Sequence, residues 1–273
     1  MATYQNLVQD VLRNGFDQPD RTGTGCRKLF GKQLSFHVAR YGDNYSIHLP
    51  LDTTRKINTK FLFDELIWFI SGSTNVNDLP PDSRKLWQAW AREDGSLGPL
   101  YGHQLRHLKV DQLQEALRLL REDPNSRRNV MTTWNPEQLS EMALAPCHGT
   151  VIQLHTHTVG LRTYLSMTTF QRSADLLVGV PYNIASYAAL LQILARLAGM
   201  HAYQLSYMFG DVHIYSNHFE AAETILTRIP YESPILHLSP DIMWDTPLEE
   251  IKASHFEIQD YQHHPHIKLP VAV

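Results

Sequence analysis

The chain has 273 residues, of which 43% are hydrophobic and 19% are charged, and its formal net charge is −4 at neutral pH. This length allows a sizeable buried core, while the negative balance argues against general nucleic-acid binding, which usually needs a basic surface. The start of the chain is polar where a signal peptide is apolar, and no stretch approaches the roughly 20 apolar residues that span a membrane, so we expect a cytoplasmic protein.

The first half of the chain predicts three helices, a loop and a strand. Residues 7–12 carry apolar side chains at helical spacing. The glycine-rich, polar residues 20–25 predict a loop, and alternating apolar side chains over residues 34–38 predict a strand. Residues 60–70 are strongly apolar and predict a buried helix, whereas residues 110–121 are apolar on one face and predict an amphipathic helix.

The second half of the chain predicts more strands, separated by a long helix. In chain order, we expect strands at residues 129–134 and 149–169 (the second broken by a turn at Val159-Gly160), a helix at 183–197, a strand at 205–209 and a helix at 213–226. Helices and strands mix without strict alternation, which favours an α/β (α+β) fold with a mixed twisted sheet and a long central helix. Repeats and linker-like runs are absent from the sequence, so we expect a single domain over residues 1–273.

Cys147 is the strongest candidate nucleophile. It follows a proline, which restricts the backbone, and it precedes His148. A thiol has an ordinary pKa of about 8.5 and needs nearby positive charge to ionise at neutral pH. A lone cysteine is more often a small buried hydrophobic residue, so the local sequence leaves both interpretations open. Cys26 is distant and suggests no disulfide, which suits a reducing compartment.

Several arginines form a second group of candidates. Arg127 and Arg128 are adjacent and follow a predicted helix, Arg172 and Ser173 follow a predicted strand, and Arg21 lies in the glycine-rich loop. The forked donors of a guanidinium group match the oxygens of a phosphate. Paired arginines are more often solvated surface residues, so each pair alone is a weak indication of a dianion site.

The chain resembles the folate-dependent thymidylate synthases from end to end. The stretches that carry the resemblance are, in order, Asp20-Arg21-Thr22-Gly23-Thr24-Gly25, Glu65-Leu66-Ile67-Trp68-Phe69, Leu97-Gly98-Pro99-Leu100-Tyr101-Gly102, Ser126-Arg127-Arg128, Leu144-Ala145-Pro146-Cys147-His148, Gln171-Arg172-Ser173-Ala174-Asp175, Pro181-Tyr182-Asn183-Ile184-Ala185-Ser186-Tyr187, Gly210-Asp211-Val212-His213-Ile214-Tyr215-Ser216-Asn217-His218 and Pro270-Val271-Ala272-Val273. The resemblance implies reductive methylation of dUMP to dTMP with 5,10-methylenetetrahydrofolate as co-substrate and without a metal.

The resemblance also implies catalytic roles. The catalytic set is Cys147, Glu65, Tyr101, His148, Arg172, Asp175 and Asn183. Cys147 would add to carbon 6 of the uracil ring and make carbon 5 nucleophilic. Glu65 would move protons through ordered water, and Tyr101 with His148 would assist the later proton removal. Arg172 would both favour the thiolate and bind phosphate.

For dUMP, the resemblance implies contacts from Arg21, Arg127, Arg128, Gln171, Arg172, Ser173, Asn183, His213 and Tyr215. The amide of Asn183 would read the pyrimidine edge, because an amide offers both a donor and an acceptor to O4 and N3–H of uracil. His213 and Tyr215 would hold the 3′-hydroxyl. Arg127 and Arg128 match a pair that the family donates across a subunit interface, which implies an obligate homodimer.

For the folate, the resemblance implies contacts from Leu86, Trp87, Trp90, Leu144, Asp175, Val178, Gly179, Tyr182 and Ala272. Trp87 and Trp90 are three residues apart, so on one helix they would share a face. Without the resemblance, ordinary core packing is the simpler interpretation of both tryptophans. The C-terminal residues 270–273 would close over the site and exclude water.

The chain also departs from the family pattern. The departures are Arg55, Leu105, Leu108, Tyr182 and Met208-Phe209, together with longer stretches at residues 39–49 and between Cys147 and Arg172. Relatives that diverge in this manner let water capture the exocyclic carbon, so the alternative product is 5-hydroxymethyl-dUMP. Trp87, Leu144 and the C-terminal tail favour methylation.

Two further alternatives belong to other classes of function. His155 and His157 are alternate residues of a predicted strand and could chelate a metal ion, and His263, His264 and His266 form a second histidine group. Histidines on strands are more often exposed polar residues, so we do not expect a metal. A nucleotide-binding or RNA-binding protein without catalysis is the other alternative, and the negative charge and the full set of expected catalytic residues argue against it.

Overall fold

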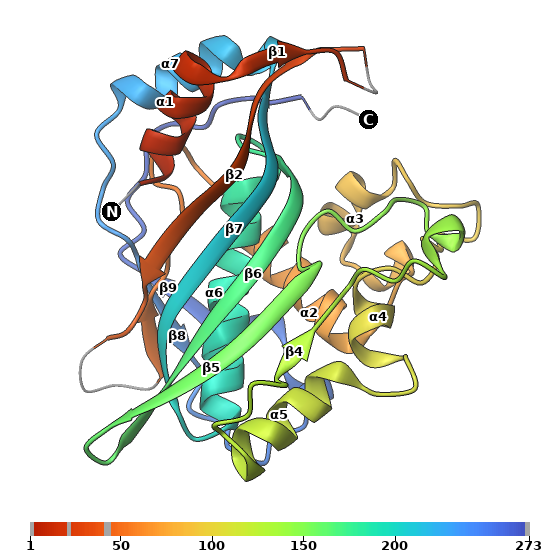
Figure 1. Ribbon diagram of the computed structural model, residues 1–273, viewed down its shortest axis with the longest axis vertical. Coiled ribbons are helices and arrows are strands. Elements are labelled where there is room, and N and C mark those ends of the chain that lie inside the picture. Colours follow the sequence, from red (N-terminus) through yellow and green to blue (C-terminus); the bar gives the residue numbers. More distant parts are fainter. Residues whose placement is uncertain (1–2, 21–22, 41–44, 271–273) are drawn as a thin grey trace.

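A computed structural model describes residues 3–20, 23–40 and 45–270 of the chain. Their main feature is a long, twisted, six-stranded sheet in the order β1-β2-β7-β6-β5-β4 (Figure 1). The strands are β1 (Phe16–Gln18), β2 (Cys26–His37), β4 (Val130–Met131), β5 (Val151–Val159), β6 (Arg162–Asp175) and β7 (His201–Tyr215). Only β6 and β7 pair in parallel among these, so the sheet is mixed.

Helix α6 (Gly179–Leu197) connects the two parallel strands and packs behind the sheet (Figure 1). Almost all of its side chains are buried, as expected for a helix that is apolar on every side. Helix α2 (Thr59–Ser71) also contacts α6. The amide oxygen of Asn58 caps the first turn of α2 at 3.2 Å from the backbone nitrogen of Phe61, and Gly72, with φ of 84°, ends the helix in the left-handed region.

The remaining elements surround this core. The other α-helices are α1 (Tyr4–Asn14), α3 (Pro81–Trp87), α4 (Gly102–Arg106), α5 (Gln112–Glu122) and α7 (Phe219–Thr227). A second sheet, in the order β3-β8-β9, contains β3 (Ser46–His48), β8 (Ile235–Leu238) and β9 (Phe256–Gln259). Short 3-10 helices are η1 (Val76–Asp78), η2 (Leu139–Glu141), η3 (Ser216–His218), η4 (Leu248–Glu250) and η5 (Ala253–His255).

The mixed α/β fold class is confirmed, and so are most of the predicted elements. Residues 7–12 and 60–70 lie in α1 and α2, and the turn at Val159-Gly160 separates β5 from β6. The helix predicted at 110–121 corresponds to α5, which begins only at Gln112. The predicted helix at 213–226 is wrong at its start, because β7 continues to Tyr215 and α7 begins only at Phe219. The backbone of His213 pairs with both β2 and β6, and these ladders outweigh the local helical pattern.

Two other strand predictions need correction. The strand predicted at residues 205–209 is longer in the structure, where β7 runs from His201 to Tyr215. The predicted strand at 129–134 is reduced to Val130–Met131. Arg172 and Ser173 lie within β6 rather than after it. The predicted loop at residues 20–25 lies partly outside the described residues.

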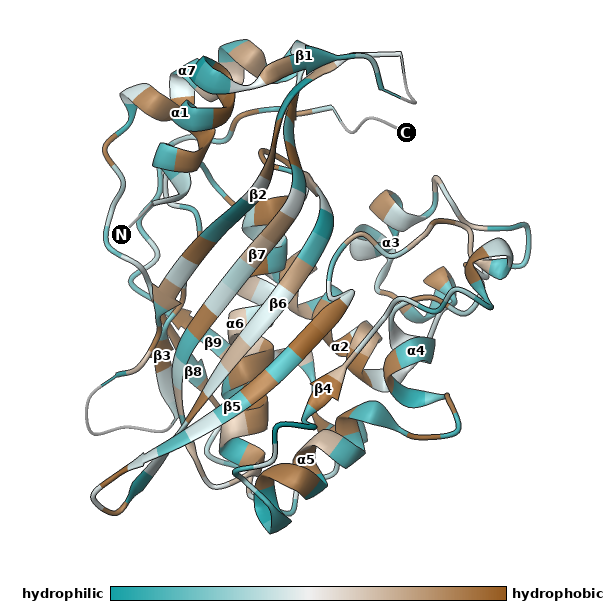
Figure 2. Cartoon of the chain, viewed as in Figure 1, coloured by the Kyte–Doolittle hydropathy of each residue, from teal (hydrophilic) through white to brown (hydrophobic). Residues whose placement is uncertain are grey.

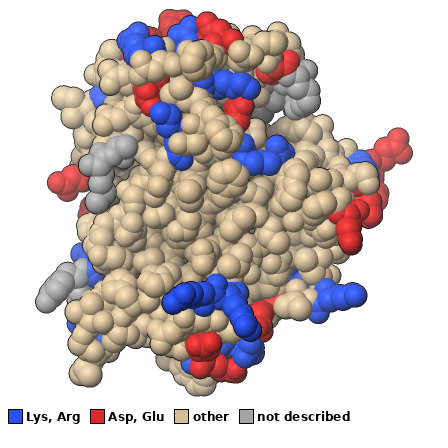
Figure 3. Space-filling model, viewed as in Figure 1, with Lys and Arg blue, Asp and Glu red and all other residues tan. Residues whose placement is uncertain are grey.

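The outer face of the large sheet carries few charges. The front view is nearly free of lysine, arginine, aspartate and glutamate over the middle and lower parts of β7, β6 and β5, whereas charged side chains lie over the upper part of the sheet (Figure 3). Apolar side chains are exposed on these strands and on β4, among them Phe30, Val130, Val151 and Met208, and the hydropathy colouring shows apolar segments running along β7 and β5 (Figure 2). Within the described part of the chain, no helix is both long and apolar enough to span a membrane.

Candidate active site

A cavity of about 530 Å³ lies where the carboxyl ends of β6 and β7 meet the start of α6 and the helices α2 and α3. It brings together the predicted residues Glu65, Leu86, Trp87, Trp90, Tyr101, Leu144, Cys147, His148, Gln171, Ser173, Asp175, Val178, Gly179, Tyr182, Asn183, His213 and Tyr215. In open α/β sheets, ligands bind beyond the carboxyl ends of the strands. The parallel register pairs Ser173 with Asp211 and Asp175 with His213, so the two strands present their polar ends side by side.

Cys147 lines this cavity, beside Tyr101. The hydroxyl oxygen of Tyr101 accepts a hydrogen bond from the backbone N–H of Cys147 at 2.9 Å and lies 3.3 Å from Sγ. Burial raises the pKa of the Cys147 thiol, and this effect outweighs the opposing effects of Tyr101 and of the Arg172 charge. In the free protein, burial therefore opposes the thiolate more strongly than the Arg172 charge favours it.

Tyr101 holds this position with an unusual backbone. Its φ is 26° and its ψ is −85°, directly before α4. A non-glycine residue with positive φ is uncommon and is strained when bulky. Burial raises the pKa of the Tyr101 hydroxyl well above its usual value, so this hydroxyl keeps its proton at neutral pH.

Arg172 supports the loop that carries the nucleophile. Its Nε donates to the carbonyl of Pro146 at 2.8 Å, and its Nη2 donates to the carbonyl of Ala145 at 2.9 Å. Its backbone N–H donates to the carbonyl of Cys147 at 2.9 Å, and its guanidinium carbon lies 5.0 Å from the centre of the Trp134 ring. Arg172 thus fixes the backbone on both sides of the sulfur.

Glu65 lies on α2, in an apolar environment. Its Oε1 accepts a hydrogen bond from the indole N–H of Trp87 at 2.7 Å. Burial raises the pKa of Glu65 to about 7, which suits a group that both gives and takes a proton near neutral pH. Trp87 ends α3, but Trp90 lies beyond that helix, so the two tryptophans do not share a helical face as predicted.

His148 is held between two tyrosines. Its ring stacks on Tyr101 with the centres 4.5 Å apart, and its Nδ1 lies 3.0 Å from the hydroxyl of Tyr187. Burial lowers the pKa of His148 to about 3, so the ring is neutral at physiological pH. Gly149 adopts φ of +63°, and a Cβ there would lie 2.0 Å from the Tyr187 hydroxyl oxygen, so the residue after His148 has to be glycine.

Asn183 and Gln171 are hydrogen-bonded to one another. Nε2 of Gln171 donates to Oδ1 of Asn183 at 3.2 Å and to the carbonyl of Ser173 at 3.1 Å. Both amides are buried, with side chains that line the cavity. The oxygen of Asn183 is thereby engaged, which turns its NH2 group towards other partners.

The carboxylate of Asp211 orients the ring of His213. Its Nδ1 lies 2.8 Å from Oδ1 of Asp211, and Oδ2 of Asp211 accepts from Nζ of Lys28 at 2.9 Å. The hydrogen bond from His213 and the Lys28 charge hold the pKa of Asp211 below its usual value. This pairing directs Nε2 of His213 away from Asp211. Tyr215 lies next on the same face of the strand, with ring centres 5.2 Å apart.

The wall opposite the strand ends is aromatic and aliphatic. The rings of Trp87 and Trp90 have centres 6.0 Å apart, and Tyr182 meets Phe61 edge to face at 5.6 Å. Oδ1 of Asp175 accepts the backbone N–H groups of Leu177 and Val178, at 3.2 and 3.1 Å. A flat, largely apolar ligand with hydrogen-bond donors along one edge fits such walls, because a carboxylate has a second oxygen to accept from that edge.

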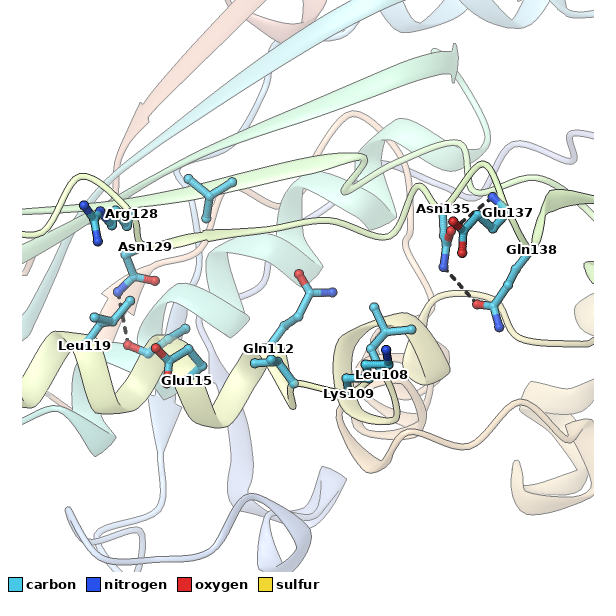
Figure 4. Close-up of a pocket in the computed structure, with 13 residues that line it drawn as sticks. Leu108, Lys109, Gln112, Glu115, Leu119, Arg128, Asn129, Asn135, Glu137 and Gln138 are labelled. Atoms are coloured by element: carbon cyan, nitrogen blue, oxygen red, sulfur yellow. Dashed lines mark hydrogen bonds between the residues drawn. The ribbon is translucent and has the colours of Figure 1, made fainter.

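Some predicted site residues lie elsewhere. Arg21 and Ala272 fall outside the described residues. Arg127 and Arg128 are exposed, and neither they nor Arg172 line the cavity of Cys147. The guanidinium group of Arg172 instead donates to the carbonyls of Pro146 and Ala145. Arg128 borders a separate cavity of about 610 Å³ beside α5, where Asn135 donates to Gln138 at 3.0 Å (Figure 4).

Part of the cavity lining consists of residues outside the predicted site. The additional residues are Arg55, Asn58, Phe61, Asp82, Lys85, His266, Ile267, Lys268 and Leu269. Phe61 lies within the apolar run at residues 60–70 that predicted α2, and Arg55 precedes that run. Their closeness in sequence to Glu65 is the signal that could have indicated them. Residues 266–269 have no regular secondary structure, and no periodicity indicates that they reach the site.

The metal alternative gains no support. Across residues 3–20, 23–40 and 45–270, no group of three or more histidine, cysteine, aspartate or glutamate side chains could hold a metal ion. The ring of His157 instead contacts Tyr164 and Tyr203, with centres 5.3 and 4.7 Å apart.

A comparison with protein families gives a match along nearly the whole chain. The family model described as thymidylate synthase matches residues 2–273. The matched region includes every residue that lines the cavity of Cys147.

Proposed function

Because the chain belongs to the thymidylate synthase family, we propose that it catalyses the reductive methylation of dUMP to dTMP. The family supports one-carbon transfer to dUMP with methylenetetrahydrofolate as co-substrate. One observation carries the proposal further: Sγ of Cys147 lies in a cavity together with a carboxyl of pKa about 7, a neutral histidine and a buried amide pair.

In the proposed reaction, Cys147 is the nucleophile. Its sulfur forms a bond to carbon 6 of the uracil ring, and the electron pair of the 5,6 double bond moves towards O4. Because burial raises the pKa of the thiol, the thiol gives its proton to water as the carbon–sulfur bond forms. The Tyr101 hydroxyl, 3.3 Å from Sγ, and the Arg172 charge stabilise the developing thiolate.

Proton handling falls to the buried residues. Glu65 can donate a proton towards O4 and take one back, since its pKa lies near 7. Carbon 5 must lose its hydrogen once the new carbon is attached. The neutral ring of His148 and the hydroxyl of Tyr101, stacked at 4.5 Å, support an assisting role in that removal through water.

Substrate recognition is proposed for the strand ends. Asn183 would read the pyrimidine edge, while His213 and Tyr215 would hold the 3′-hydroxyl. The 5′-phosphate would meet Ser173 and Arg172, with Gln171 supporting the base. Arg21 belongs to the same proposal, from the resemblance alone.

The aromatic wall is proposed to bind the folate. When bound, methylenetetrahydrofolate supplies the one-carbon unit and, for methylation, the hydride. Residues of this chain that would hold it are Leu86, Trp87, Trp90, Leu144, Asp175, Val178, Gly179 and Tyr182, with Ala272 added from the resemblance. The two tryptophans would also exclude water from the reacting carbon.

Product analysis tests the proposal against its alternative. The purified protein is incubated with dUMP and methylenetetrahydrofolate, the nucleotide is identified by mass, and dihydrofolate is followed by its absorbance. Methylation yields dTMP and dihydrofolate in equal amounts. A product heavier than dTMP by one oxygen, without dihydrofolate, would instead establish the dUMP hydroxymethylase. If the folded protein formed neither of these products, the proposed enzymatic function would be contradicted.

We also propose that the chain acts as a cytoplasmic homodimer whose single catalytic domain spans residues 1–273. The outer face of the sheet, which carries few charges and several exposed apolar side chains (Figure 3), is the kind of surface that a second copy covers. Arg127 and Arg128, exposed and outside the cavity of their own chain, would then reach the phosphate of the partner.

Subunit mixing tests this shared site. The Arg127→Ala and Cys147→Ala proteins should each have little or no activity. Mixing them after partial unfolding should restore activity, because one of the two sites in each hybrid dimer is intact. Sedimentation measures the dimer, and differently tagged subunits verify the exchange. Proven exchange with no recovery contradicts the donation of Arg127.

A further inference from the structure

We propose that Tyr207 is a positioning residue for base selectivity: through Gln171, it holds the Asn183 amide in the one orientation that suits uracil. The inference rests on the proposed function and adds a determinant that does not touch the ligand. Tyr207 does not line the cavity, and its side chain is fully buried behind it.

Three side chains form a connected line from the sheet interior to the cavity. The hydroxyl of Tyr207 donates to Oε1 of Gln171 at 2.8 Å. Nε2 of Gln171 then donates to Oδ1 of Asn183 at 3.2 Å. Tyr207 lies on β7, Gln171 on β6 and Asn183 on α6, so the line links three separate elements.

The direction of these bonds follows from what each partner can do. The second N–H of Gln171 donates to the carbonyl of Ser173 at 3.1 Å, and a carbonyl can only accept. The amide nitrogen of Gln171 is therefore fixed on the side of Ser173 and Asn183, and its oxygen faces Tyr207. The Tyr207 hydroxyl meets that oxygen as a donor, and burial raises its pKa well above the usual value, so the proton is retained.

The ring of Tyr207 cannot easily give up this position. Its exposure is 0%, and it packs against Phe209 and Tyr187 with ring centres 5.0 and 5.9 Å apart. Its backbone pairs with Thr169 on β6. A side chain held on all sides loses little further freedom when its hydroxyl forms a bond.

The consequence reaches the base. Since Oδ1 of Asn183 accepts from Gln171, the NH2 group of Asn183 is available to donate to a carbonyl such as O4 of uracil. A 4-amino group at that position would place its N–H donors against the NH2 donors of Asn183, and no hydrogen bond would form. Without the Tyr207 hydroxyl, Oε1 of Gln171 would be buried and unpaired, and only the carbonyl of Ser173 would still hold that amide. The amide of Gln171 could then move away from Asn183, which would free Asn183 to reverse. A reversed Asn183 would present its oxygen, which suits a 4-amino pyrimidine.

The test is the relative affinity for dUMP and dCMP, measured by calorimetry on the full-length protein. Tyr207→Phe should lower the ratio of dUMP to dCMP affinity by about 10-fold, the effect expected of one buried polar group losing its partner. Gln171→Glu should lower the ratio further, because a carboxylate can only accept and therefore attracts the NH2 group of Asn183. Tyr4→Phe is the matched control, since it removes a hydroxyl that donates to the carbonyl of Leu176 at 2.9 Å without touching this line.

The outcomes separate the two proposals. A wild-type protein that does not prefer dUMP to dCMP would overturn the proposed function itself. A wild-type preference that survives unchanged in folded Tyr207→Phe would overturn only the role of Tyr207. If Tyr207→Phe fails to fold, Gln171→Glu decides, and an unaltered ratio there also refutes the inference. A general loss of stability would weaken binding of both nucleotides alike and leave the ratio constant.

Discussion

Two walls of the cavity work in different ways. The buried wall consists of Glu65, Trp87, Tyr101 and His148. The strand-end wall consists of Gln171, Asn183 and His213, and Asp211 supports His213 from outside the cavity. In the buried wall, desolvation raises the pKa of Glu65 and lowers that of His148. In the strand-end wall, each side chain is fixed by a neighbour at 2.8 to 3.2 Å. Apolar surroundings thus set protonation on one side, and hydrogen bonds set position on the other.

Cys147 lies between the two walls, and its replacement should have the largest effect. Cys147→Ala removes the sulfur that both walls serve, so the rate of dTMP formation should fall by at least about 1,000-fold, as for the loss of other nucleophiles. Turnover and circular dichroism are measured together. The control is Cys26→Ala, which removes the other thiol at a buried position on β2 and should keep most activity. Normal turnover by folded Cys147→Ala would refute the mechanism.

A substitution in the strand-end wall should alter base choice. Asn183→Asp replaces the NH2 donor with an acceptor, so the preference for dUMP over dCMP should fall by about 100-fold, as for sites that leave a buried polar group unpaired. The ratio of kcat/KM for the two nucleotides measures it. An unchanged ratio would show that Asn183 does not read the base edge.

The sequence named residues of both walls, but it did not predict how the two walls differ. Gln171, Asn183 and His213 lie in compact motifs and line the cavity, even though the helix assigned at 213–226 was wrong at its start. The buried wall depends on distant contacts: Trp87 reaches Glu65 from α3, and residues 266–269 reach the cavity from the end of the chain. Burial, and hence the pKa of Glu65, cannot be read from a local pattern.

A substitution in the buried wall should instead change the response to pH. The pKa of Glu65 is raised from 4.5 to about 7, so its contribution to stability is complete below pH 4.5 and is lost as the pH rises through 7. Relative to Glu65→Gln, the unfolding free energy of the wild type should fall on the order of 3 kcal/mol across that range. Urea unfolding at several pH values measures the difference.

The matched control for this prediction is Glu257→Gln on β9. Its side chain is exposed, so its substitution should not reproduce the difference in pH dependence. Parallel stability profiles for the wild type and Glu65→Gln would mean that Glu65 is not desolvated, and the contrast between the two walls would fail.

The smallest effect is expected where a side chain only orients another. Asp211→Ala removes the partner of His213 and Lys28, so KM for dUMP should rise by about 10-fold with little change in kcat, because one hydrogen-bonded contact is lost in the bound state. Steady-state kinetics separates the two constants. Asp17→Ala, which breaks an exposed ion pair with Arg27, is the control. A fall in kcat alone would contradict an orienting role.

The backbone of Tyr101 has a consequence for engineering this protein. With φ of 26°, the residue adopts a conformation that costs of order 1–3 kcal/mol for an L side chain, and glycine would adopt it freely. The ring of Tyr101 is buried, however, and packs on His148 and Phe69 with centres 4.5 and 4.8 Å apart, so the cavity that glycine would leave costs more than the strain that it would relieve. A screen that selects only for survival of heating should therefore retain Tyr101, and with it the hydroxyl beside the sulfur.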